Sequence, residues 1–89
     1  MKIIEKIIKD PERAYYYARK VIKGRWPEAE PYIMKNSHWA YLYTRDIIKG
    51  RWPEAEPYMI GTGWTQYIKF LKRHISESEA EDALALRKK

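Results

Sequence analysis

Eighty-nine residues are enough for one domain or one short array of repeats. Hydrophobic residues at 45% and aromatic residues at 15% favour a folded chain over a disordered one, and the absence of cysteine excludes disulfide frameworks, thiolate zinc sites and a cysteine nucleophile. The formal net charge of +6 favours acidic partners, whether nucleic acid, an anionic membrane or an acidic protein surface.

The chain opens with residues 1–9, in which Lys and Glu interrupt a run of isoleucines. These charges are not typical of a signal peptide, and no uncharged run is long enough to span a bilayer. We therefore expect a cytoplasmic protein without a membrane partner. Ile3, Ile4, Ile7 and Ile8 predict a helix that closes the N-terminal end of the fold.

An internal duplication organises the rest of the chain. Residues 22–32 read IKGRWPEAEPY, and residues 48–58 read the same letters 26 positions later. Repetition at such a period is typical of helical units that stack on their neighbours. The sequence thus predicts an all-α fold, a short α-helical repeat array of 26-residue helix-turn-helix units with a closing helix at each end. The predicted parts are an N-terminal half-unit (1–9), repeat 1 (10–35), repeat 2 (36–61), a divergent third helix (62–75) and a closing helix (76–89).

The long helix of each repeat has recognisable start and stop signals. In the first copy Asp10 is a good N-cap and proline follows at the first helical position. This helix is predicted to reach Lys23 and to stop at Gly24 in the left-handed conformation. The second copy is predicted over 37–49, with Gly50 as the equivalent stop.

A shorter helix is expected within residues 27–35 and again within 53–60. Both segments contain two prolines, and Pro31 or Pro57 would lack its hydrogen bond and crowd the backbone if the helix began at the first proline. We therefore expect Pro-Glu-Ala-Glu to form a separate turn and the helix to begin at the second proline. A kinked helix is the alternative.

The same 26-residue offset predicts a third, divergent long helix at about 63–75. It places Thr62 at the N-cap position and aligns Tyr67 with Tyr15 and Tyr41.

A closing helix is predicted after this third helix, because residues 76–79 read Ser-x-x-Glu, the pattern of a capping box. Its acidic start and basic end suit the helix dipole. A polar closing helix is also what a short array needs at its end.

The repeated unit, A-Y-x-Y-(A/T)-R-x-(V/I)-I-K-G-R-W-P-E-A-E-P-Y, resembles a short Tyr-rich helical repeat found in small, mostly uncharacterised proteins of tailed bacteriophages. The resemblance covers residues 10–60, or 10–75 with the divergent third copy. It implies an interaction role, because small accessory phage proteins often act on host machinery, including restriction and CRISPR defences. It implies no functional role for any individual residue.

The sequence gives little support for catalysis. His38 and His74 are the only histidines, and they lack the spacing of a metal motif, so both are interpreted as structural or solvated. No serine has a credible base partner. We expect no enzymatic activity, no cofactor and no metal.

Basic residues near the C-terminal ends of the long helices are the main candidates for binding. Packed helices lie about 8–10 Å apart, so equivalent residues in successive copies would form parallel basic rows. The alternative is that these charges only complement helix dipoles and keep the chain soluble. The candidate residues are Arg19, Lys23, Arg25, Arg45, Lys49, Arg51, Lys72 and Arg73.

Aromatic residues supply the other candidates. Trp39 and Tyr43 are expected at a partly exposed contact surface, a composition that favours a protein interface over a small-molecule pocket. Trp26 and Trp52 are predicted to be structural wedges between helices. The leading hypothesis is a non-enzymatic interaction module that binds a host protein or protein complex, and an inhibitor of a host defence system is one concrete form of it. Direct binding of nucleic acid through the basic rows is the alternative, and the oligomeric state stays open.

Overall fold

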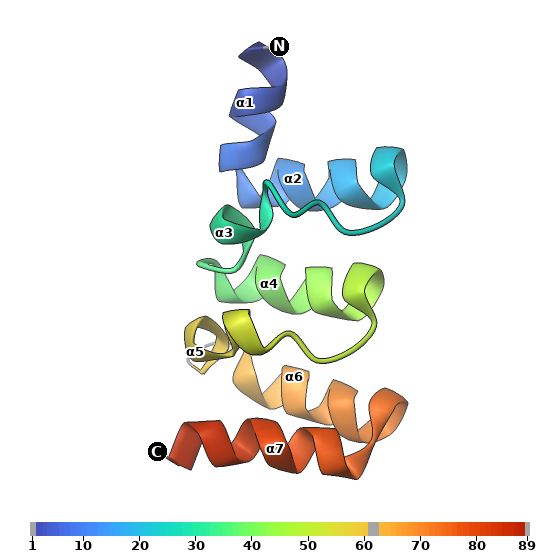
Figure 1. Cartoon of the computed structure of the whole chain (residues 1–89), viewed down its shortest axis with the longest axis vertical. Helices are drawn as coiled ribbons and strands as arrows, with labels where there is room; N and C mark the ends of the chain where they lie inside the picture. Colours follow the sequence, from blue (N-terminus) through green and yellow to red (C-terminus); the bar gives the residue numbers. More distant parts are fainter. Residues whose placement is uncertain (1, 61–62, 89) are drawn as a thin grey trace.

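The computed structural model describes the backbone of residues 2–60 and 63–88 and the side chains of residues 4–60 and 63–85. Every regular element within these residues is helical, which confirms the predicted all-α class. Three long helices lie one above another and run in the same direction, while shorter helices lie beside one end of the stack (Figure 1). The molecule measures 41 × 23 × 17 Å along its principal axes.

Each long helix is an α-helix that widens into a π-helical turn at its C-terminal end. The three are α2 (Pro11–Tyr17) with η1 (Ala18–Ile22), α4 (Ser37–Tyr43) with η2 (Thr44–Ile48), and α6 (Trp64–Phe70) with η4 (Leu71–Ile75). The shorter elements are α1 (Lys2–Lys9), α3 (Glu30–Ile33), the 3-10 turn η3 (Pro53–Ala55), α5 (Glu56–Met59) and α7 (Glu77–Lys88). α3 and α5 each begin at the glutamate before the second proline, one residue earlier than predicted, so only the first three residues of Pro-Glu-Ala-Glu form a turn outside the α-helix. In the second copy this turn is η3, which runs directly into α5.

The long helices of the two copies begin in the same way. The Asp10 carboxylate accepts hydrogen bonds from the backbone N–H groups of Glu12 and Arg13, at 3.1 and 3.3 Å. The side-chain oxygen of Asn36 accepts one from the Trp39 N–H at 3.2 Å. Both caps satisfy N–H groups that the helix itself leaves without partners.

The prediction that Gly24 and Gly50 adopt the left-handed conformation is wrong. The left-handed residues are the lysines before them, Lys23 with φ 61° and Lys49 with φ 58°. The π-turn is the reason, because the Lys23 N–H still donates to the Ala18 carbonyl at 2.7 Å. The lysine is therefore the residue at which the chain must turn away from the helix.

Small side chains allow the stacked helices to approach closely. Ala14, Ala18 and Ala40 have no exposed surface. The indole rings of Trp26 and Trp52 are also buried, at 8% and 1% exposure, and belong to the same continuous core. Burial of two such large rings makes the loops after the long helices part of the core.

The third long helix is displaced by one residue from its predicted register. α6 begins 27 positions after α4, so Tyr67 takes the position of Ala40. The predicted cap Thr62 lies outside the described residues, and Gly63 occupies the N-cap position. A Cβ on Gly63 would lie 3.0 Å from the Ser37 carbonyl oxygen, so glycine allows the starts of α4 and α6 to meet.

The C-terminal end of the stack is closed by α7, which runs back along α6 (Figure 1). Ala80 and Ala83 of α7 are fully buried. The Glu79 N–H donates to the Ser76 side-chain oxygen at 3.1 Å, which is one half of the predicted capping box.

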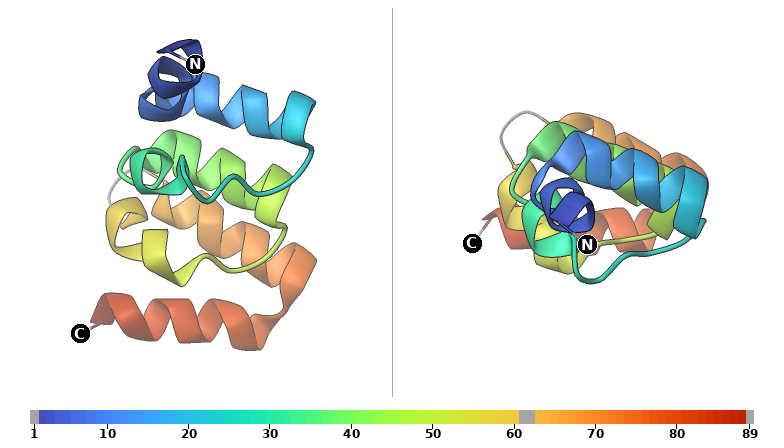
Figure 2. Two further views of the ribbon diagram at one scale, coloured as in Figure 1. Left: turned by 45° about the horizontal axis from the view of Figure 1, so that its top comes forward. Right: turned by 90° about the horizontal axis from the view of Figure 1, so that it is seen from above.

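At the N-terminal end, α1 stands across the start of α2 (Figure 2). Ile7 and Ile8 are half-buried against the core, and Ile4 is 36% exposed. Ile3, the fourth predicted closing residue, lies outside the described side chains. α1 therefore covers only part of α2.

Candidate functional site

A groove of about 490 Å³ runs between the second and third long helices. Basic and histidine side chains surround an aromatic and aliphatic floor, and no described residue that lines the groove is acidic. The lining residues are His38, Tyr41, Leu42, Arg45, Gln66, Lys69, Phe70, Arg73 and His74. A second hollow of about 290 Å³ shares Arg45, Phe70 and His74 with it and adds Lys49 and Ile75. We call this continuous surface the basic groove.

Helical spacing explains why these side chains meet. On α4 and η2, His38, Leu42 and Arg45 follow one another three or four residues apart and so share a face. Lys69 and Arg73 repeat this spacing on α6 and η4. Because the two helices lie side by side (Figure 1), both rows border the same groove.

Arg45 is held in place within the basic groove. Two of its N–H groups donate to the carboxylate of Asp46, at 2.7 and 2.9 Å, and its guanidinium lies 5.7 Å from the centre of the Tyr41 ring. Arginine has five N–H donors, so three remain for a ligand. The hydrogen bonds from Arg45 lower the pKa of Asp46 against the opposing effect of burial, and the Tyr15 hydroxyl also donates to this carboxylate.

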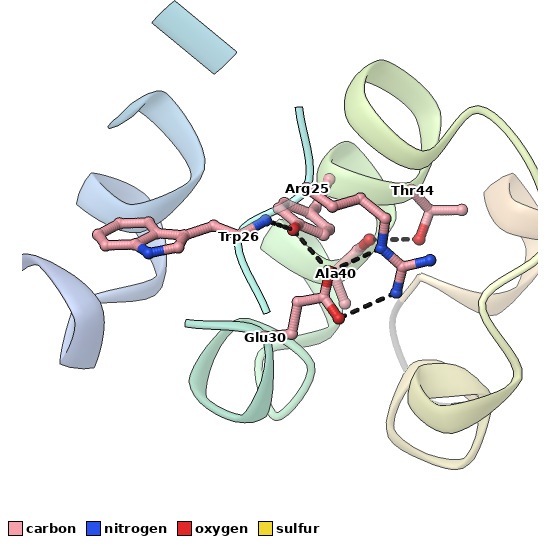
Figure 3. Close-up of polar contacts among 6 residues, drawn as sticks. Arg25, Trp26, Glu30, Ala40 and Thr44 are labelled. Carbon is pink, nitrogen blue, oxygen red and sulfur yellow. Dashed lines mark hydrogen bonds and ion pairs between the residues drawn. The ribbon is translucent and has the colours of Figure 1, made fainter. Parts of the chain in front are cut away.

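Arg25 and Arg51 do not belong to free basic rows, and the structure corrects that prediction. Arg25 donates to both carboxylate oxygens of Glu30, at 2.8 and 2.9 Å, and Arg51 does the same to Glu56 at 2.6 and 2.9 Å. Figure 3 shows the Arg25 guanidinium facing the Glu30 carboxylate. The Glu56 side chain has no exposed surface and that of Glu30 is 11% exposed. These arginines therefore neutralise buried carboxylates.

Tyr43 is also misassigned by the sequence, because it has no exposed surface. Its hydroxyl donates to Glu30 at 2.8 Å and accepts from the Trp26 N–H at 2.7 Å. In the next unit the Tyr67 hydroxyl donates to Glu56 at 2.5 Å and accepts from the Trp52 N–H at 3.0 Å. Each Arg-Trp-Pro-Glu-Ala-Glu loop is thus fastened to the following long helix.

Burial and hydrogen bonding around the buried carboxylates shift the pKa of Glu30, Tyr43 and Tyr67. Burial alone would raise the pKa of Glu30, but hydrogen bonds from Arg25 and Tyr43 outweigh it and the pKa is lowered. Burial raises the pKa of Tyr43 and of Tyr67, and the hydrogen bonds to the carboxylates raise it further.

The remaining predicted binding residues lie apart from this cluster. Arg19 and Lys23 line a hollow of about 200 Å³ between η1 and η2, together with Lys49 and Asp46. Lys72 is exposed on η4. Arg73 joins Arg45 in the basic groove.

Trp39 is half-buried, with its ring 5.5 Å from that of Tyr15 and 5.8 Å from that of Tyr16. It packs between the first two units and offers only part of its ring to solvent. The predicted aromatic contact surface therefore reduces to the exposed sides of Trp39 and Tyr16.

Sequence reasoning missed the two histidines as groove residues. His38 and His74 are both exposed and lie on neighbouring helices along one groove. The available signal was helical spacing, because His38 lies four residues before Leu42 and His74 four residues after Phe70. The Arg–Glu pairs could have been found from their identical five-residue spacing in both copies.

Within the described residues, no group of three His, Asp or Glu side chains is placed to hold a metal ion. The helices described here also lack the length and apolar character needed to cross a bilayer. Searches of protein-family models, of curated proteins and of solved structures find nothing that matches the chain.

Proposed function

We propose that this protein is a non-enzymatic interaction module whose basic groove binds an acidic segment of a partner protein. The observation that carries the proposal is the make-up of the groove: Arg45, Lys69 and Arg73 surround a floor of Tyr41 and Phe70, with no acidic residue among the described lining residues. Charge complementarity of this kind steers an acidic partner to the surface. The floor adds apolar contact once the partner is in place.

A protein segment fits the groove better than a nucleic acid does. Phe70 is only 8% exposed, and the guanidinium of Arg45 lies over the Tyr41 ring, so neither offers an open ring on which a base could stack. Asp46 also neutralises part of the charge of Arg45. An acidic chain with occasional apolar residues meets both the charged rim and the floor.

The resemblance to repeats of tailed phages supports a host protein as the partner. In that case the module would act in the cytoplasm of an infected bacterium, and a component of a restriction or CRISPR defence system is one concrete form of the partner.

A titration with two labelled probes tests the proposal. The probes are a peptide of alternating glutamate and leucine and a single-stranded thymidine oligonucleotide, followed by fluorescence anisotropy. We expect the peptide to bind and the Lys69→Glu, Arg73→Glu variant to lose about tenfold in affinity or more. The matched control is Lys9→Glu with Lys35→Glu, because both are exposed, lie outside the groove and change the net charge equally.

An equal loss of peptide affinity in both double variants would show that net charge alone explains the binding, and it would contradict the proposal. Capture from host lysate followed by mass spectrometry then identifies the partner, with the same two variants as the criterion for specific capture.

Binding of nucleic acid is the second candidate, and one observation favours it. The C-terminal ends of the three long helices lie above one another (Figure 1), and they carry Arg19, Lys23, Lys49 and Lys72. Phosphates spaced along a strand could follow such a row. Tighter binding of the oligonucleotide than of the peptide, with a steep loss of affinity as salt rises, would favour this candidate.

A further inference from the structure

The same contacts join consecutive units twice in this molecule. In each junction a tyrosine hydroxyl on the later long helix, of Tyr43 or Tyr67, lies between a tryptophan backbone N–H and a glutamate carboxylate of the earlier loop. The junction between the first two units has a further bond, from the Tyr15 hydroxyl to Asp46. Tyr67 lies about one turn earlier on its helix than Tyr43 does, so what the two junctions share is a hydroxyl held between the tryptophan N–H and the glutamate carboxylate.

Among the residues that the structure describes, no earlier repeat unit covers the equivalent face of α2. Twenty-six positions separate Tyr17 of α2 and Val21 of η1 from Tyr43 of α4 and Ile47 of η2. Tyr43 has no exposed surface and Ile47 is half-buried, whereas Tyr17 is only half-buried and Val21 is 60% exposed. The outward-facing surface of α2 is thus a copy of an interface that is covered elsewhere in the same molecule.

Tyr17 occupies the place of Tyr43 in this copy. Its ring lies 4.8 Å from that of Trp26, as the Tyr43 ring lies 5.1 Å from that of Trp52. Among the described residues, however, none forms a hydrogen bond with the Tyr17 hydroxyl. Residues 1–10 contain no Arg-Trp-Pro-Glu sequence that could supply one.

A hollow lies over this face and has room for a ligand. Its volume is about 640 Å³, and both α1 and α2 contribute to its lining. α1 rises from one end of α2 and leaves the rest of that side uncovered (Figures 1 and 2). The lining residues are Lys6, Ile7, Glu12, Arg13, Tyr16, Tyr17, Lys20 and Val21.

We propose that the outward face of α2 binds, from another polypeptide, a loop with the chemistry of Arg-Trp-Pro-Glu-Ala-Glu. The Tyr17 hydroxyl would lie between a backbone N–H and a carboxylate of that loop, as Tyr43 does with Trp26 and Glu30. The inference rests on the likeness of this face to the junction below it, where the Tyr43 hydroxyl contacts Trp26 and Glu30. Lys20 on η1 stands at the position of Asp46 on η2. The partner would therefore place an acidic group beside Lys20, where the first unit places the Tyr15 hydroxyl beside Asp46.

A second copy of the chain does not fit as the donor of this loop. Both of its own loops are engaged, through Glu30 with Tyr43 and through Glu56 with Tyr67. The partner is therefore a different chain with an unengaged loop of this kind. The inference is independent of the basic groove, which lies on other residues.

A labelled synthetic peptide with the sequence of residues 22–34 is the probe, added to the intact protein and followed by anisotropy. The internal loops keep their own sites, because an intramolecular segment acts at a high effective concentration. We expect Tyr17→Phe to weaken binding about tenfold, because the hydroxyl takes part in two hydrogen bonds, one of them to a charged group. A peptide with glutamine in place of Glu30 should weaken to a similar extent.

Tyr58→Phe is the matched control, since Tyr58 is 46% exposed on α5 and should leave affinity unchanged. Circular dichroism establishes that both variants stay folded. Absence of peptide binding, or binding that Tyr17→Phe leaves unchanged, overturns the proposal. A dimer that forms in sedimentation experiments and is dissociated by Val21→Lys would also overturn the proposal, because a second copy of this chain would then occupy the face.

Discussion

A buried carboxylate held between an arginine and a tyrosine is the most distinctive arrangement at the residue scale. Glu56 has no exposed side-chain surface, yet Arg51 and Tyr67 satisfy both of its oxygens. Such a cluster is costly to break, because removal of one partner leaves a buried charge unpaired. Its role is to fix the path of the loop after each long helix and hence the position of the next.

The ion pair of Arg51 gives the first stability prediction. Arg51→Leu should lower the free energy of unfolding by about 3–5 kcal/mol, because it leaves the buried carboxylate of Glu56 without its counter-ion. Arg25→Leu should cost less, since the Arg25 side chain is 48% exposed and that of Arg51 is 22% exposed. Urea denaturation measures both, with the exposed Arg73→Leu as control. Equal, small effects in all three variants would contradict the structural role.

The lowered pKa values of Asp46 and Glu30 predict an acid-sensitive fold. Their ordinary values are 3.8 and 4.5, and both are lower in the folded state. Between the two states' values the unfolded chain binds more protons, so the free energy of unfolding falls as pH falls below about 4.5. Asp46→Asn with Glu30→Gln should flatten this dependence in urea denaturation between neutral and acid pH. An unchanged slope in that variant would refute the assignment.

At the scale of the elements, the C-terminal π-turns set the shape of the long helices. The first two, η1 and η2, end on a lysine with positive φ, a conformation that costs a non-glycine residue about 1–2 kcal/mol, whereas η4 is followed by Ser76 in an extended conformation. The same turn occurs in both copies, so the chain reverses at equivalent places. This is why the two loops place equivalent glutamates, Glu30 and Glu56, beside a tyrosine of the following long helix, although Tyr67 lies about one turn earlier on its helix than Tyr43 does.

The left-handed conformation of the lysines predicts a substitution that stabilises the protein, whereas the arginine variants above are expected to destabilise it. Lys49→Gly should stabilise the protein by about 0.5–1 kcal/mol, because the relief of backbone strain exceeds the entropy that glycine adds to the unfolded chain. Lys72→Gly, inside η4, should instead destabilise it by about 1 kcal/mol. Thermal unfolding of both variants makes the comparison, and destabilisation by Lys49→Gly would contradict the assigned conformation.

The contact between the starts of α4 and α6 is tested by Gly63→Ala. The added Cβ would meet the Ser37 carbonyl oxygen at 3.0 Å, so we expect a loss of about 1–3 kcal/mol. Gly24→Ala is the matched control, because nothing lies within 4 Å of its Cβ position. The difference in their urea midpoints measures the effect. A neutral Gly63→Ala would mean that the two helices have room to separate.

Helix signals in the sequence predicted several elements well. The Asp10 and Asn36 caps, the late start of α3 and α5 and the Ser76 cap follow from local chemistry, which depends on near neighbours. The left-handed conformation of Lys23 and Lys49 could not be predicted in this way, because hydrophobic spacing does not reveal where a helix widens by one residue. The glycines after them gave the more conventional stop signal.

At the scale of the whole molecule, the exact duplication predicted equivalent long helices and the side on which their basic ends lie. The third helix was placed one residue early, because Tyr67 and Ile68 are both buried, so the hydrophobic pattern fits either register. The Arg–Glu clusters were missed, because charged residues next to prolines read as exposed turn residues until a tyrosine from the next helix reaches them. The basic groove depends on two neighbouring helices together, so only part of it could be predicted.

The groove also defines how the molecule would meet a partner. Its basic rim comes from Arg45 on η2, Lys69 on α6 and Arg73 on η4, and its floor comes from Tyr41 on α4 and Phe70 on α6. The Glu56 cluster fastens the loop that follows η2 to Tyr67 of α6, which favours a groove that is formed before binding. A pre-formed surface of this kind lowers the ordering cost of association.

The most direct test of the proposed function is a map of amide chemical shifts while the acidic Glu-Leu peptide is added to the intact protein. The account predicts saturable changes on both sides of the basic groove, at His38, Arg45 and Lys49 on one helix and at Lys69 and Arg73 on the next. Changes confined to α3 and α5, or no saturable change at any amide, would contradict it.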